Sequence, residues 1–146
     1  MSATFLSNFM RIALQKTSAE RGLACDLEMG IMDMVNMEQS DVLSTRFTGM
    51  DNMRKALATG EAIITNNAVM DPALAPVTNT NFSNLRVVVV IPLADYGAVY
   101  VDQPIRRGII AREIVNRLML LANYVMENSL IESSTDQLDA LYEEIQ

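Results

Sequence analysis

The feature that most constrains the fold is an unbroken apolar run at residues 87–91, which is followed by Pro92. A short run of this kind, rich in β-branched residues, is typical of a strand buried on both faces of a sheet. We therefore predict a central strand over residues 85–93. Residues 95–97 then form a tight turn, and residues 98–101 return as the neighbouring strand.

The remaining apolar periodicities predict helices near both ends of the chain and short strands between them. The predicted helices cover residues 4–17, the segment between an N-cap at Thr48 and a stop at Gly60, and residues 110–131. A last helix is predicted to start after Ser134, whose spacing to Gln137 is that of a capping box. The further predicted strands cover residues 22–28, 31–37 and 62–65. Residues 41–47 are ambiguous, and residues 66–84 are the longest irregular stretch. Because the strand connections are short, we predict antiparallel pairs in an α+β sheet with helices on one side.

Length and composition favour one globular domain. The chain has 146 residues, of which 50% are hydrophobic and 20% are charged. It contains no histidine and one cysteine, Cys25. These counts exclude a Ser-His-Asp triad, a Cys-His pair, histidine-ligated metals and multi-cysteine sites. We therefore expect no catalytic residues, no metal and no cofactor, and we expect that the protein is not an enzyme.

The net charge of −7 is unevenly distributed. The last twenty residues hold six of the 18 acidic residues and none of the 11 basic ones, so the rest of the chain is nearly neutral. Nucleic acids and anionic membranes need clustered Lys and Arg, so we expect neither as a partner. No apolar run approaches the ~20 residues of a membrane span, and no signal peptide is recognisable, so we expect a cytoplasmic location.

Four arginines lie within a short stretch around the start of the long C-terminal helix: Arg106, Arg107, Arg112 and Arg117. An anion at the helix start would be favoured by the helix dipole. Pairing of these arginines with the acidic tail of the same chain or of a partner chain is the alternative. Surface ion pairs contribute only about 0–1 kcal/mol each, so they would fix orientation more than strength.

The terminal helices carry more apolar side chains than one sheet face requires. If they were exposed to solvent, such side chains would form an aggregation-prone patch, and a twofold dimer would cover them. We therefore predict a homodimer whose interface is formed by Phe5, Phe9, Ile12, Leu118, Leu121, Val125, Leu138, Leu141 and Ile145. The alternative is that the last helix folds back on its own subunit.

Four passages resemble, in order, those of bacterial GAF domains. They are AERG at residues 19–22, ATGEAIITNNA at residues 58–68 followed by Asp71-Pro72, IPL at residues 91–93, and GAVYVD at residues 97–102. The resemblance covers about residues 4–128. It implies a GAF-like fold related to PAS domains, with a central antiparallel sheet of about six strands and the N- and C-terminal helices on one face. We assign residues 1–130 to this domain and residues 131–146 to an acidic helical extension.

The family's ligand pocket, where one exists, lies on the other sheet face beneath the long loop and the second helix. Side chains there with hydrogen-bonding groups are candidates for binding a small polar ligand. The candidates are Thr65, Asn66, Asp71, Asn79, Asn81, Arg86 and Tyr100. Arg86 is either an anion anchor or a member of an ion pair at a strand end, and the loop residues either bind a ligand or make local turns.

Departures from the family's better-known members exclude their activities. A bilin site needs histidine, sulfoxide reduction needs several cysteines, and the pattern of the cyclic-nucleotide binders is missing. Cys25 is expected to be a small buried apolar residue, and most of the 11 methionines are expected to fill the core. We therefore expect a non-catalytic, homodimeric domain in bacterial signal transduction, which senses a small molecule or contacts a signalling protein. The alternative is a structural dimerisation or adaptor module without a ligand.

Overall fold

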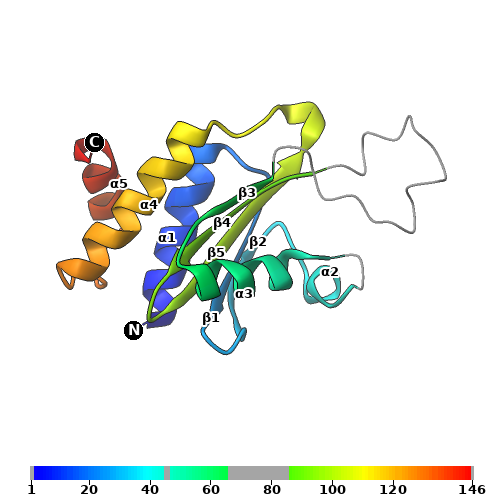
Figure 1. The fold of residues 1–146 in the computed structure, drawn as a ribbon, viewed down its shortest axis with the longest axis horizontal. Helices are drawn as coiled ribbons and strands as arrows, with labels where there is room; N and C mark the ends of the chain where they lie inside the picture. The colour runs from blue at the N-terminus through cyan, green and yellow to red at the C-terminus, as the bar shows by residue number, and fades with distance from the viewer. Residues whose placement is uncertain (1, 45–46, 66–85, 146) are drawn as a thin grey trace.

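The computed structural model describes residues 2–44, 47–65 and 86–145 and shows one antiparallel sheet with helices on both of its faces (Figure 1). The strands are β1 (Arg21–Asp26), β2 (Ile31–Val35), β3 (Ile63–Thr65), β4 (Arg86–Leu93) and β5 (Gly97–Pro104). Their order in the sheet is β2-β1-β5-β4-β3, and every neighbouring pair is antiparallel. This confirms the predicted α+β class, with five described strands where about six were expected.

The helices are α1 (Ser2–Thr17), α2 (Gln39–Leu43), α3 (Gly49–Thr59), α4 (Arg112–Glu127) and α5 (Thr135–Glu144), with a 3-10 turn, η2, at Ile105–Arg107. The helices α1, α4 and α5 gather on one face of the sheet, the α1 face, as predicted for the N- and C-terminal helices (Figure 1). The helix α3 packs on the opposite face, the α3 face, so the prediction of helices on one side of the sheet only is wrong. None of the described helices has the length and apolar character needed to cross a membrane.

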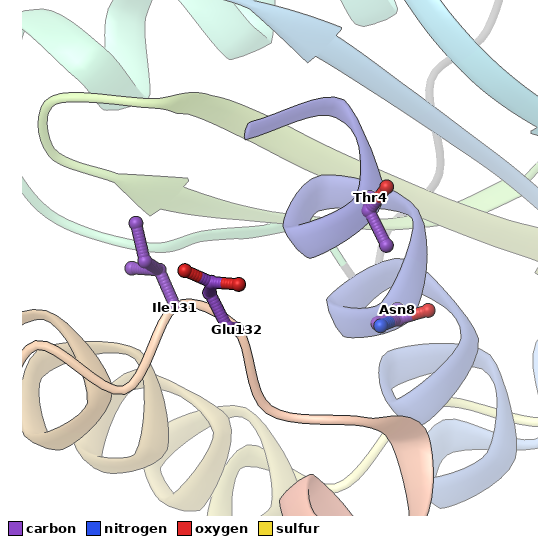
Figure 2. A pocket seen from close by; sticks show the side chains of 4 residues that line it. All are labelled: Thr4, Asn8, Ile131 and Glu132. Atoms are coloured by element: carbon purple, nitrogen blue, oxygen red, sulfur yellow. The ribbon is translucent and has the colours of Figure 1, made fainter. Parts of the chain in front are cut away.

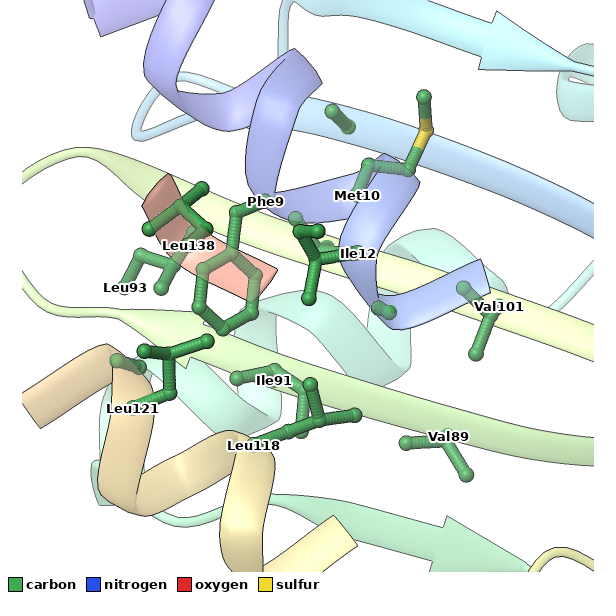
Figure 3. Packing of buried hydrophobic residues seen from close by; sticks show 14 of the residues in the cluster. Phe9, Met10, Ile12, Val89, Ile91, Leu93, Val101, Leu118, Leu121 and Leu138 are labelled. Carbon is green, nitrogen blue, oxygen red and sulfur yellow. The ribbon is translucent and has the colours of Figure 1, made fainter. Parts of the chain in front are cut away.

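The central strand β4 supplies both cores because successive side chains of a strand point to opposite faces. Val87, Val89 and Ile91 pack on the α1 face, whereas Val88 and Val90 pack on the α3 face. Figure 3 shows the α1-face core, where side chains of α1, α4 and α5 meet those of β4 and β5. The prediction of a strand buried on both sides is therefore confirmed.

Local signals fixed several element ends correctly. Helix α3 begins after Thr48 and ends before Gly60, which has the left-handed φ of 72° that glycine adopts without strain. Helix α5 begins after Ser134, whose hydroxyl accepts from the backbone N–H of Gln137 while the Gln137 side chain accepts from the Ser134 N–H. This is the capping box that the sequence predicts at this position.

The long C-terminal helix is shorter than predicted at both ends. It covers Arg112–Glu127 rather than residues 110–131. At its end the N–H of Leu130 bonds to the carbonyl of Val125 at 2.8 Å, and Ser129 has a φ of 56°. These features form a Schellman motif, which stops a helix. The sequence did not predict this helix end because Ser129, rather than the usual glycine, occupies the left-handed position.

The predicted interface residues lie in the core of a single subunit. Seven of them are at most 1% exposed, and Leu141 and Ile145 are partly buried against the same core. The assignment to a dimer interface is therefore corrected for seven side chains that are covered by their own chain, Phe5, Phe9, Ile12, Leu118, Leu121, Val125 and Leu138, and it stays a prediction for Leu141 and Ile145. The reason is that α5 folds back onto α1 and α4, the alternative arrangement above. The predicted extension thus shares the core of the domain, and homodimerisation itself stays a prediction.

The acidic tail pairs with a lysine of α1. Lys16 Nζ lies 2.5 Å from Asp139 and 2.9 Å from Glu143, and it also lies over the ring of Tyr142. Of the four clustered arginines, Arg117 touches the tail by stacking on the Tyr142 ring. Lys16 thus pairs with two of the acids of α5, and salt bridges between the four arginines and the tail are not seen among the described residues of the chain.

Candidate functional site

The candidate site is built around a buried acid on the α3 face. Asp102 of β5 is fully buried, and the sheet register places it opposite Arg21 of β1 and Val88 of β4. Thr65 of β3 lies opposite Val88, so one row across the sheet runs from Thr65 to Arg21. Arg86 and Tyr100 share the same face because each is two residues from a member of that row.

The acid is held by hydrogen bonds from three side chains. Arg21 donates to it twice, from Nε at 2.8 Å and from Nη2 at 2.6 Å. Arg86 Nη2 donates at 3.1 Å, and the Tyr100 hydroxyl also donates to Asp102. Arg86 pairs in addition with Glu20, which lies just before β1. We call these five residues the Asp102 cluster: Glu20, Arg21, Arg86, Tyr100 and Asp102.

Burial and neighbouring charge shift the pKa values of Tyr100 and Arg21. Burial raises the pKa of Tyr100 well above its usual range, and the negative charge of Asp102 raises it further, so the phenol stays protonated and donates. Burial alone would lower the pKa of Arg21, but hydrogen bonding and attraction by Asp102 raise it. Two cations and two carboxylates then make the cluster neutral overall, which is the condition under which buried charges are tolerated.

Two buried polar atoms beside the cluster have no hydrogen-bond partner among the described residues. They are Thr65 Oγ1 and Arg86 Nε, at the end of β3 and the start of β4. A buried donor without a partner costs about 1–3 kcal/mol, and most such groups in native proteins are satisfied. A ligand that brings a hydrogen-bond acceptor to these two donors would therefore gain binding free energy by satisfying them.

Apolar and sulfur-containing side chains form the rest of the α3 face. Phe47 packs edge-on against Tyr100 with ring centroids 5.1 Å apart. A Cβ at Gly49, where α3 begins, would lie 2.8 Å from the Tyr100 ring, so only glycine allows this approach. Flexible methionines fill much of the remaining space and can repack around a guest: Met29, Met34, Met37, Met50 and Met53.

Cys25 lies in this apolar region and behaves as the sequence predicts. It is fully buried, with Sγ 3.9 Å from the sulfur of Met50. Burial, with a smaller effect of the neighbouring Asp26, raises the pKa of the thiol to about 12. The nucleophilic thiolate is then a minute fraction of the thiol at neutral pH.

We predict that Cys25 resists thiol reagents in the native protein. At pH 8 a pKa of about 12 leaves roughly one molecule in ten thousand as thiolate. Ellman's reagent should therefore label native protein only at the rate at which the chain opens, and should label urea-unfolded protein at once. Fast stoichiometric labelling of the native protein would contradict the buried position of this thiol.

The predicted ligand residues divide into two groups. Thr65, Arg86 and Tyr100 come together on the α3 face, and Arg86 forms the ion pair that was one of its two predicted roles. Asn66, Asp71, Asn79 and Asn81 lie outside the described residues. Sequence reasoning missed Glu20, Arg21 and Asp102. Their signal was an acid in an otherwise apolar strand, since a buried acid requires a basic partner.

A small hollow lies on the α1 face. Thr4 and Asn8 of α1 line it together with Ile131 and Glu132 of the α4–α5 connection (Figure 2). Its volume is about 100 Å³, well below the roughly 300–1,000 Å³ of small-molecule sites. The described residues contain no group of three or more acidic or cysteine side chains placed to hold a metal ion.

Comparison with known proteins supports the fold. No protein-family model and no curated protein sequence matches the chain. Among solved structures, the GAF domain/HD domain protein from Geobacter sulfurreducens is similar, with a TM-score of 0.50 over 86% of this chain and 94% of that chain. The fold is GAF-like. Because the sequence identity is 9%, the likeness extends to the fold alone. In this GAF-like fold, the Asp102 cluster occupies the α3 face, where the resemblance placed a pocket.

Proposed function

We propose that the chain is a non-catalytic regulatory domain that senses a small molecule on the α3 face and acts as a homodimer. The observation that carries the proposal is the pair of unsatisfied buried atoms, Thr65 Oγ1 and Arg86 Nε, beside a neutral charged cluster and a methionine-lined apolar surface. Ligand sites combine a largely apolar lining with a few placed polar groups. A ligand with an apolar body and an acceptor such as a carbonyl or carboxylate oxygen fits this face.

Native mass spectrometry of the purified protein tests the proposal. We expect a non-covalent small-molecule adduct in the wild type and a reduced adduct in Thr65→Val, which removes the hydroxyl with little change in volume. Because Thr65 Oγ1 has no partner among the described residues, Thr65→Val should leave the melting temperature of ligand-free protein unchanged or raised. Thr59→Val is the matched control, since the Thr59 hydroxyl bonds to the helix backbone on an exposed part of α3.

Absence of any bound or stabilising small molecule would contradict the sensing proposal. If no adduct is found and no metabolite fraction raises the melting temperature, the sensing proposal fails, because any ligand that binds the native state stabilises it by mass action. The chain would then be a structural dimerisation or adaptor module. One observation favours that second candidate: much of the α3 face is filled by the chain's own side chains, with Phe47 and Gly49 packed on Tyr100.

A further inference from the structure

The outward side of α4 carries an apolar pair that the core does not use. Leu120 is 45% exposed and Tyr124 is 42% exposed, one helical turn apart at the middle of the helix. Residues four apart on a helix lie side by side on its surface. The pair is flanked by the polar exposed residues Asn116 and Asn123, so it forms a short stripe along the outside of the helical layer.

Charges are placed on either side of this stripe in an unusual way. Arg117 lies one turn before Leu120, and Glu127 lies one turn after Tyr124. The last turn of α4 contains the acid Glu127 and no base, whereas its first turn contains both Arg112 and Glu113. An acid near a helix end opposes the helix dipole, so α4 alone does not explain the position of Glu127.

We propose that α4 is the interface between two copies of this chain, packed antiparallel about a twofold axis. In that arrangement Leu120 of each copy lies against the second copy's Tyr124, which places the apolar pairs at the centre. Arg117 of each copy then lies opposite the second copy's Glu127. An isologous interface repeats each contact, so the two apolar contacts are flanked by two opposite-charge pairs.

Antiparallel packing also sets the positive end of one helix dipole beside the negative end of the other. Charge complementarity therefore selects a second copy, packed in the antiparallel sense, as the occupant of this face.

The inference rests on the proposed function only in requiring a homodimer, and it does not require a ligand. Sedimentation velocity over a range of protein concentrations measures the association of two copies. We expect a concentration-dependent dimer for the wild type, weakened at least about tenfold by Leu120→Glu because both copies lose an apolar contact and gain a buried charge. Leu43→Glu is the matched control, since Leu43 is 72% exposed on α2 and should leave association unchanged.

A charge exchange tests the direction of packing. Arg117→Glu should weaken the dimer by opposing the second copy's Glu127, and the double variant R117E/E127R should restore it. In a parallel arrangement each residue would face its own counterpart, so like charges would meet in the wild type and in both variants. Neither variant would then change association, and an unchanged dimer in Arg117→Glu would overturn the antiparallel packing. Thermal melting accompanies each variant, because Arg117 also stacks on Tyr142 of α5.

The outcomes separate this inference from the sensing proposal. A wild type that stays monomeric at the highest soluble concentration, or a dimer that Leu120→Glu leaves intact, overturns the interface. A monomer with a bound small molecule would overturn the interface and the homodimeric part of the proposed function, and would leave ligand sensing standing. A dimer that shows no adduct and that no metabolite fraction stabilises would support the interface and remove the sensing function.

Discussion

Asp102→Asn is expected to lower the free energy of unfolding by about 3–5 kcal/mol, the cost of removing one partner from a buried ion pair. The substitution keeps the volume of the side chain but removes the charge that Arg21 and Arg86 share. The Arg21 and Arg86 side chains are 20% and 23% exposed, so water relieves part of the cost. We therefore expect a value near the lower end of the range, measured by urea unfolding.

Asp51→Asn is the control for this experiment. Asp51 pairs with Arg54 on the surface of α3, where the two side chains are 85% and 57% exposed. Exposed pairs of this kind contribute a few tenths of a kcal/mol, so this variant should unfold almost as the wild type does. Equal stabilities for the Asn variants at 102 and 51 would show that Asp102 does not hold the cluster in solution.

The Asp102 cluster also shows what sequence reasoning could reach. Tyr100 and Arg86 were both expected on the pocket face of the sheet, because the family resemblance places a ligand site there. The acid that joins them was missed because its partners are distant in sequence: Arg21 and Asp102 are 81 residues apart. Strand register creates that contact, and no local pattern carries the register of β1 on β5.

Helix ends were likewise predicted from the sequence where the signal came from neighbouring residues. The capping box at Ser134 and the left-handed Gly60 involve neighbours within a turn or so, and both were predicted from the sequence. The stop after Glu127 was also local, but it used Ser129 in a conformation that the sequence marks only when glycine is present. Amphipathic pattern indicated that α5 has one apolar side, but not which surface covers it.

Leu138→Ala is expected to cost about 2–5 kcal/mol, the usual penalty for removing a fully buried leucine side chain. Leu138 is fully buried among α1, α4 and α5 (Figure 3). Leu43→Ala, at a position 72% exposed, should change stability by less than about 0.5 kcal/mol.

The dependence of stability on protein concentration distinguishes packing of α5 on its own subunit from packing on a second chain. If α5 covers its own subunit, the cost of Leu138→Ala is the same at all protein concentrations. It is also the same in a Leu120→Glu background, because distant independent sites add. If α5 instead packed on a second chain, dilution would remove its contribution, and the stabilities of wild type and variant would converge as the dimer dissociates. A cost that persists in dilute protein therefore assigns α5 to the domain core and leaves the outer side of α4 as the surface open to a second copy.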